Sequence, residues 1–350
     1  MTILFAVLLF SFLIFIHELG HFLAAKASGV RVNEFSMFMG PAIFKKQVGD
    51  TLYALRCIPI GGYCAMEGEN EDTDDPHSFQ KAAWWKRLII LVAGSFMNLV
   101  AGFLILAIVF APAKQFAVPV IDSAMEGCTV VREGGLQVGD EILELDGEKI
   151  YVQSDFSMML QLNPGDTHDI VVKRDGKKLV FNDYKMEKHL FPGEETERYG
   201  FSFGIEDATF GNKLKYTWNT GINVVRSVRL SLQMMISGQA GIRDMTGPVG
   251  IVQIMSDTAE QSSTKTDAVL NVLYIGGFLA INLAVMNMLP IPALDGGRVV
   301  GLLLTCAIEK ITRKRLDAKY EGYIHGIGMI LLFALMALIL FKDIFVIFKR

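Results

Sequence analysis

The chain begins with the apolar stretch MTILFAVLLFSFLIFIHELGHFLAA (residues 1–25), which contains the pentapeptide His17-Glu18-Leu19-Gly20-His21. In a helix, the two histidines lie one turn apart on the same face, where both imidazoles can bind one Zn²⁺. The glutamate between them is placed to take a proton from the water that the metal activates. Residues 1–16 contain no charged side chain, so we expect the metal site inside a membrane.

A secretory signal peptide is the alternative interpretation of residues 1–16, with the histidines just beyond it. Such a peptide begins with a basic region, which this stretch lacks. The apolar character also resumes after the motif, at residues 22–25. Because Glu and His are costly inside a spanning helix, they are candidates for function there. The metal interpretation is therefore favoured.

The hydropathy of the whole chain predicts a polytopic α-helical membrane protein. Hydrophobic residues make up 51% of the 350 residues, and the mean hydropathy is +0.37. Apolar stretches near or above the ~20 residues of a spanning helix predict four transmembrane helices in the lipid bilayer. They cover residues 2–25, 88–113, 268–294 and 323–341.

The basic residues predict the orientation of these helices. They gather in two loops, residues 26–87 and 298–319. Because Lys and Arg mark cytoplasmic loops, we expect both termini and the long segment 114–267 outside, and the metal site near the cytoplasmic face. Lys342, Lys349 and Arg350 at the C-terminus are a competing signal. The net charge of −4 argues against a nucleic-acid partner.

A third metal ligand is expected at Asp295, because a catalytic zinc usually has three protein ligands. Asp295 directly follows the apolar stretch 268–294, in which Pro290 and Pro292 predict a break of the helix. We expect Gly296 and Gly297 to form a tight turn that aims the carboxylate inward. A solvent-facing turn residue is the alternative for Asp295 taken alone. Its predicted depth matches that of His17 and His21, which favours the ligand.

Together the two motifs, His17-Glu18-Leu19-Gly20-His21 and Asn287-x-x-Pro290-x-Pro292-x-Leu294-Asp295-Gly296, resemble the site-2 protease family of intramembrane zinc metalloproteases. The bacterial RseP-type branch is the most similar. The resemblance covers essentially the whole chain. It implies that His17, His21 and Asp295 bind Zn²⁺, that Glu18 is the catalytic base, and that Asn287 engages the substrate.

The resemblance also implies partners and location. Substrates would be single-pass transmembrane proteins already cleaved on the extracytoplasmic side, such as anti-sigma factors or remnant signal peptides, in regulated intramembrane proteolysis. The protein would be a multi-pass protein of the bacterial cytoplasmic membrane. One departure concerns the second helix, where the family commonly has G-P-x-x-N. This chain has Ser95 in place of the proline, although Gly94 and Asn98 remain.

Between the first two helices, residues 32–65 predict strands joined by turns. They resemble the membrane re-entrant β-hairpin of the family, and Gly61, Gly62 and Tyr63 at its end would contact the substrate. Cleavage requires an unwound peptide, which can pair with an exposed strand edge. A cytoplasmic hairpin without substrate contact is the alternative.

Outside the membrane, residues 113–200 predict one β-rich domain. The run from Gly134 to Gly147 resembles the PDZ signature G-L-x-x-G-D-x-I-x-x-x-[ND]-G. This domain either binds peptides at a sheet edge or blocks bulky substrates. Residues 201–266 follow as a basic amphipathic helix (211–236) and a linker, with the helix either on the membrane surface or against the PDZ domain. The zinc motif and the hairpin belong to residues 1–112, and Asp295 belongs to residues 267–350.

Two functions of another class remain open from the residues: a non-proteolytic PDZ-containing membrane scaffold and a metal transporter. A scaffold would not require Glu18 or a metal. A transporter would bury further polar residues in its second and fourth helices, which offer only Ser95, Asn98 and His325. This scarcity counts against transport.

Overall fold

The computed structural model describes residues 2–69, 73–192, 195–241, 245–313 and 319–349, so parts of the predicted basic loop 298–319, and Arg350, lie outside it. The chain forms two compact units. The first contains residues 1–109 and 224–350, and the second contains residues 110–223. The metal motifs all belong to the first unit.

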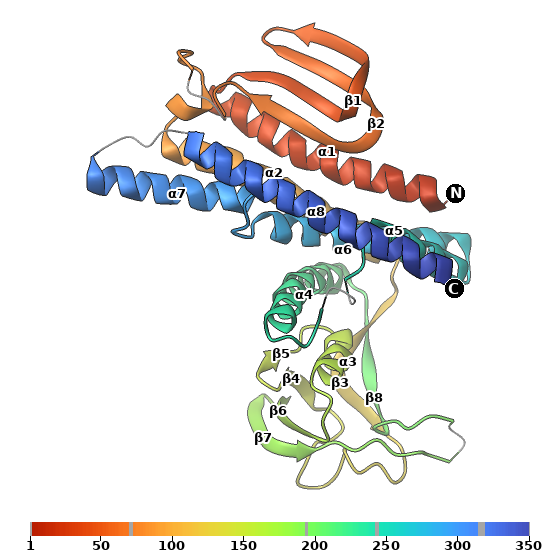
Figure 1. Cartoon of the computed structure of the whole chain (residues 1–350). Helices are drawn as coiled ribbons and strands as arrows, with labels where there is room; N and C mark the ends of the chain where they lie inside the picture. The colour runs from red at the N-terminus through yellow and green to blue at the C-terminus, as the bar shows by residue number, and fades with distance from the viewer. Residues whose placement is uncertain (1, 70–72, 193–194, 242–244, 314–318, 350) are drawn as a thin grey trace. The chain divides into compact units, whose positions relative to one another are not determined.

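Long helices dominate the first unit, as the hydropathy predicts (Figure 1). Four of them contain stretches long and apolar enough to cross a membrane, at Leu4–Ser28, Trp84–Phe110, Lys265–Asn287 and Gly322–Asp343. The prediction of a polytopic α-helical membrane protein is confirmed. The helices of this unit are α1 (Thr2–Ser28), α2 (Trp84–Phe110), α5 (Pro248–Glu260), α6 (Lys265–Asn287), α7 (Asp295–Thr312) and α8 (Lys319–Lys349), with a short 3₁₀ helix η1 (Phe79–Lys81) before α2.

Apolar side chains join these helices in several clusters. Leu13 of α1 packs with Ile105 of α2 and with Leu279 and Ala280 of α6. A second cluster brings α5 against α1 and α6 through Ala6, Leu9, Met255 and Val272. A third cluster joins Ala25 of α1 and Ile90 of α2 to Leu302 of α7. The core of this unit is therefore the packing of α1 with α2, α5, α6 and α7, and it places the histidine face of α1 against α2.

The region around Asp295 confirms one prediction and corrects another. The break expected from Pro290 and Pro292 is present, since α6 ends at Asn287 and a turn follows. The predicted tight turn at Gly296 and Gly297 is wrong, because both glycines lie in the first turn of α7. Ala293, with φ of 89°, makes the left-handed turn instead. The two glycines serve close packing, since a Cβ on Gly297 would lie 2.8 Å from the carbonyl carbon of Ile291.

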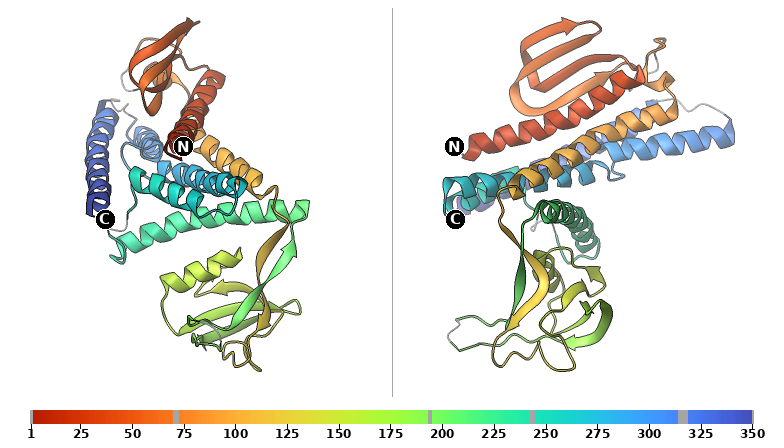
Figure 2. Two further views of the ribbon diagram at one scale, coloured as in Figure 1. Left: turned by 90° about the vertical axis from the view of Figure 1, so that its right-hand side faces the viewer. Right: turned by 180° about the vertical axis from the view of Figure 1, so that it is seen from behind.

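A curled hairpin of two long strands, β1 (Val32–Val48) and β2 (Thr51–Met66), follows α1 and lies beside it (Figure 2). The strands are antiparallel and bend back on themselves. Residues 32–37 pair with residues 62–66 on one side and with residues 52–55 on the other. Residues 62–66 therefore form an edge of the sheet, and this edge carries Gly62 and Tyr63.

The second unit contains a six-stranded antiparallel sheet with the order β7-β6-β4-β3-β8, with β5 paired to β4. Its turns at Asp146-Gly147 and Asp175-Gly176 have positive φ at all four residues, as tight hairpin turns require. The sheet continues past residue 200, since its last strand pairs with its first. The elements are β3 (Gln115–Ala124), β4 (Glu141–Leu145), β5 (Glu148–Lys149), α3 (Gln153–Leu162), β6 (Thr167–Arg174), β7 (Lys177–Lys185) and β8 (Phe201–Asp207).

Helix α4 (Phe210–Ile236) follows β8, and the division between the two units falls within it. The predicted helix at residues 211–236 is confirmed. Phe210, Leu214 and Trp218 recur every four residues and are exposed. Thr217 and Thr220 are buried, so the helix has an exposed apolar face beside a covered one.

Candidate metal centre

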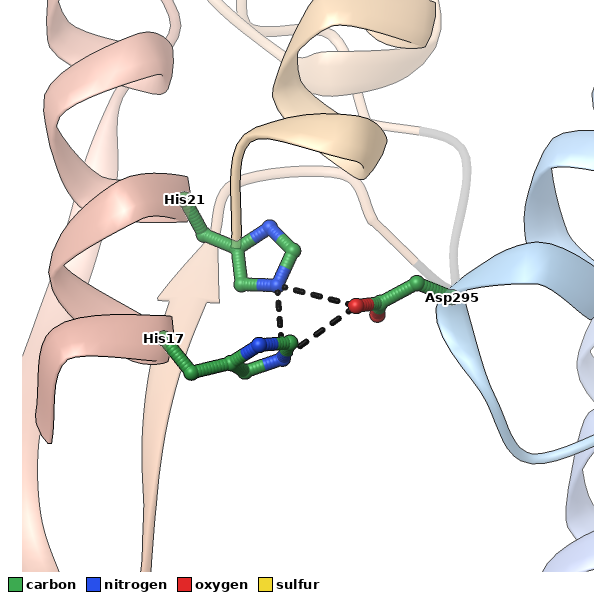
Figure 3. A group of neighbouring side chains, drawn as sticks. All are labelled: His17, His21 and Asp295. Carbon is green, nitrogen blue, oxygen red and sulfur yellow. Dashed lines mark hydrogen bonds and ion pairs between the residues drawn. The ribbon is translucent and has the colours of Figure 1, made fainter. Parts of the chain in front are cut away.

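Helix α1 brings His17 and His21 together, and the first residue of α7 adds Asp295 (Figure 3). The Nε2 atoms of the two histidines lie 3.2 Å apart. Oδ2 of Asp295 lies 3.2 Å from Nε2 of His17 and 3.4 Å from Nε2 of His21. These three residues form a group of ligand atoms that could hold a metal ion.

The three separations fit zinc. With ligand bonds of about 2.0–2.1 Å, a tetrahedral zinc requires donor atoms roughly 3.3–3.4 Å apart. Two imidazole nitrogens and one carboxylate oxygen are also the donor types that a catalytic zinc uses, with the fourth position left open. The site is shielded, since the three side chains are between 10% and 18% exposed.

Contacts behind the ligands orient them. Nδ1 of His21 lies 2.8 Å from the carbonyl oxygen of Ile90 in α2. This carbonyl accepts a hydrogen bond from Nδ1, which leaves the lone pair of Nε2 for a metal. The Asp295 carboxylate faces both histidines through Oδ2, so the same oxygen is placed to share a metal with the two Nε2 atoms.

Two glycines permit the close approach of α1 and α2 at this point. A Cβ on Gly20 would lie 2.8 Å from the carbonyl carbon of Ala93 and 2.9 Å from Cα of Gly94. A Cβ on Gly94 would lie 2.8 Å from Cε1 of His17 and closer still to Nε2 of His21. Gly94 thus leaves the space in which both imidazole rings lie.

Glu18 faces β2 of the hairpin. A Cβ on Gly62 would lie 3.4 Å from Cγ of Glu18 and 3.1 Å from the carbonyl oxygen of Ser36. The backbone of Cys64, two residues further along β2, contacts the Glu18 carboxylate. The structure therefore brings the predicted base and the edge strand of the hairpin together.

Comparison with known proteins agrees with this geometry. The sequence profile described as peptidase family M50 matches residues 5–335. The chain belongs to peptidase family M50, the site-2 protease family. A relative from Clostridium perfringens whose name describes a zinc metalloprotease is 36% identical over 346 residues, which cover 98% of each chain.

Further M50 relatives carry a more specific name. Zinc metalloprotease RasP of Bacillus licheniformis is 26% identical, and the regulator of sigma-W protease RasP of Bacillus subtilis is 24% identical, each with 98% of both chains covered. The protein is accordingly an intramembrane zinc metalloprotease, and Zn²⁺ is its cofactor. A non-proteolytic scaffold and a metal transporter do not agree with this membership.

The structure places the remaining predicted residues of this M50 chain as follows. Gly61 has a φ of 76°, and Tyr63 on the edge strand accepts a hydrogen bond from Nη2 of Arg56 at 2.6 Å. Asn287 is the last residue of α6. Within the described part of the chain, it is not a member of the metal group, and its side chain has no hydrogen bond.

Sequence reasoning missed the residues that support this site. Arg56 bonds Glu34 as well as Tyr63, so it joins distant parts of the hairpin. Gly94 enters the prediction only as part of a motif, although a glycine within an apolar helix indicates close approach of a neighbour. The hydrogen bond from His21 to the Ile90 carbonyl cannot be predicted from the sequence, because every residue has a backbone carbonyl.

Proposed function

We propose that this protease cleaves single-pass transmembrane proteins that have already been shortened on the extracytoplasmic side. Anti-sigma factors and remnant signal peptides are the substrate classes. The name of the Bacillus subtilis relative, a regulator of sigma-W protease, supports the first class. The observation that carries the proposal is the meeting of His17, His21 and Asp295 beside a strand edge, where the two histidines lie on a helix apolar enough to span a membrane.

At the site, we propose that His17, His21 and Asp295 hold Zn²⁺ and that Glu18 is the catalytic base. Zinc supplies Lewis acidity, which activates water and polarises the scissile carbonyl. The Glu18 carboxylate takes the proton that the attacking water loses and gives it to the leaving nitrogen. Its position one residue from His17, and beside β2, supports this role.

We propose that the unwound substrate joins the hairpin as an additional strand. Residues 62–66 pair with β1 on one side only, among the described residues. Gly61 and Gly62 have no side chains that would keep a peptide away from Glu18, and Tyr63 is fixed by Arg56. Main-chain hydrogen bonds at a free edge bind a peptide with little regard to its sequence. Asn287 would engage the substrate from the end of α6.

We further propose that the hairpin, residues 32–65, is re-entrant and contacts lipid. Several large apolar side chains of β1 and β2 are exposed, which water would disfavour. They are Met39, Ile43, Phe44, Val48, Leu55 and Ile58. The protein would lie in the bacterial cytoplasmic membrane with both termini and the PDZ domain outside, and with the active site near the cytoplasmic face.

For residues 113–200, together with β8, we propose a PDZ domain that excludes bulky substrates rather than binding peptides. A PDZ peptide would lie between a helix and an edge strand. Here Phe156 of α3 contacts Phe201 and Phe203 of β8, with ring centroids 5.9 and 5.3 Å apart. These rings fill the space that a ligand side chain would need. The apolar stripe of α4, Phe210, Leu214 and Trp218, supports contact of residues 201–266 with the membrane surface.

The decisive experiment compares Glu18→Gln with the wild type in detergent micelles. Zinc content and cleavage of a synthetic transmembrane peptide are measured, with exposed Glu133→Gln as the matched control. We expect Glu18→Gln to keep its zinc and lose cleavage, while the control keeps both. Unchanged cleavage by Glu18→Gln would exclude the proposed base. A substrate that carries a folded extracytoplasmic domain should resist cleavage until that domain is removed.

A further inference from the structure

Helix α8 contacts the turn that carries Asp295 through a glycine. A Cβ on Gly328 would lie 2.6 Å from the carbonyl carbon and 2.7 Å from the carbonyl oxygen of Pro292. Elsewhere α8 is largely exposed, and only 6% of the most apolar part of Gly322–Asp343 is buried. The contact at Pro292 is therefore one of few places where the helix touches the rest of the first unit.

One turn of α8 before Gly328, His325 contacts the next residue of the same turn. The backbone N–H of Ala293 donates a hydrogen bond to Nδ1 of His325, with an N–N distance of 3.1 Å. Ala293 has a φ of 89°, which a residue with a Cβ adopts only when its surroundings hold it there. His325 thus bonds the strained residue of the turn directly.

The other ring nitrogen of His325 faces a cation. Nε2 lies 3.3 Å from Nε of Arg298, and Arg298 also forms an ion pair with Glu69. A neutral imidazole accepts at one nitrogen only, so the two contacts cannot both be full hydrogen bonds. The backbone N–H of Ala293 has no other acceptor among the described residues, whereas Arg298 has Glu69. Nδ1 is therefore assigned as the acceptor.

The backbone conformation of this turn determines where Asp295 lies, because the two are close in sequence. Ala293 is two residues before Asp295, and the intervening Leu294 is the N-cap of α7. The backbone N–H of Gly297 bonds the carbonyl oxygen of Leu294 at 3.1 Å. Because α7 begins at Asp295, a change in the backbone at Ala293 redirects the first residue of that helix.

We propose that α8 positions the third zinc ligand: His325 and Gly328 hold Pro292 and Ala293 in the one backbone conformation that aims Asp295 at the two histidines. His325 is a positioning residue, since it acts through Ala293. The inference rests on the proposed role of Asp295 as a zinc ligand. It assigns the last apolar helix a task at the metal centre, beyond crossing the membrane.

The test exploits the shapes of the two side-chain amides. Asparagine places an acceptor near the position of Nδ1, whereas glutamine places one near Nε2. In the full-length protein, His325→Asn should bind zinc nearly as tightly as the wild type in competition with a chelator. His325→Gln and His325→Leu should bind it about 10- to 100-fold more weakly, the usual effect of losing a contact behind a ligand. Equal affinity in all three variants, or retention by glutamine alone, would overturn the proposal.

Gly328→Ala provides an independent measurement with a matched control. Gly326 lies two residues away on the same helix, and a Cβ there would meet nothing within 4 Å. We expect Gly328→Ala to weaken zinc binding and Gly326→Ala to leave it unchanged. Identical zinc affinities of the two alanine variants would contradict the inference even if a His325 variant failed to fold.

Asp295→Ala separates this inference from the proposed function. If Asp295→Ala keeps wild-type zinc affinity, the ligand assignment itself fails. If Asp295→Ala loses zinc while His325→Leu binds it normally, the proposed function stands and the positioning role of α8 is refuted.

Discussion

Replacing Gly94 by alanine should displace the zinc ligands without touching a charged group. A Cβ at this position would lie 2.8 Å from both Cε1 of His17 and Cδ2 of His21. An ordinary contact begins near 3.4 Å, so each ring has to retreat by at least 0.6 Å, the difference of the two distances. Metal–ligand distances tolerate only about 0.2 Å. The required movement is therefore about three times what the zinc site accepts.

Two quantities follow from this displacement. Zinc affinity should fall about 10- to 100-fold, as when a ligand loses its orientation. The free energy of unfolding should fall by about 1–3 kcal/mol, the usual result of adding a methyl group to a packed interior. Affinity is measured by competition with a fluorescent chelator, and stability by SDS titration of the full-length protein in micelles.

The matched control for Gly94→Ala lies on the same helix. A Cβ on Gly102 would lie 2.5 Å from Cγ1 of Ile281 and 3.1 Å from the carbonyl oxygen of Gly277, both on α6. Gly102→Ala should therefore lose similar stability and keep its zinc. Wild-type zinc affinity in Gly94→Ala would refute the reasoning, and so would an equal loss of zinc in both variants.

Three further predictions concern residues outside the metal group. Burial, assisted by a neighbouring carboxylate, raises the pKa of the Cys64 thiol to about 12, so at pH 8 only about one thiol in ten thousand is ionised. Peptide mapping after alkylation should find the exposed Cys57 labelled and the buried Cys64 unlabelled. Labelling of Cys64 would contradict this prediction. Arg56→Gln removes the side chain that joins distant parts of the hairpin. KM should therefore rise while the zinc content stays unchanged. An unchanged KM would exclude a role of Arg56 in shaping the substrate edge. Arg174→Met removes the guanidinium that donates two hydrogen bonds to the fully buried Asp140 carboxylate. The second unit should lose about 3–5 kcal/mol of stability while the zinc affinity stays normal. An unfolding midpoint equal to that of the wild type would argue against this.

Local patterns explain what the sequence could predict. The spacing of His17 and His21 is a property of one helix turn, and the spanning helices are properties of continuous apolar stretches. The hairpin turns at Asp146 and Asp175 follow from residue types that accept positive φ. Asp295 could be found because its neighbours are prolines and glycines, which mark a break wherever they occur.

The features that escaped prediction depend on contacts between distant residues. Ala293 makes the left-handed turn although two glycines follow it, because those glycines are needed for packing against residues 288–292. Helix α7 has no side-chain cap at its start, and its residues 298–312 form a helix rather than the loop that their basic side chains predict. The contact of Gly94 with the histidines joins residues more than 70 positions apart, so no local pattern could indicate it.

These contacts share one physical basis. Lipid tails are as apolar as the side chains, so no hydrophobic effect drives helices together within a membrane. Close backbone packing has to position the helices instead. Around the zinc site, glycines allow the helices that carry the ligands to pack closely against their neighbours. These glycines are Gly20, Gly94, Gly296, Gly297 and Gly328. Volume at these positions therefore controls where the ligands point. Enlarging any of them should lower zinc affinity first, whereas changes along the strand edge at residues 61–63 should alter KM and spare the metal.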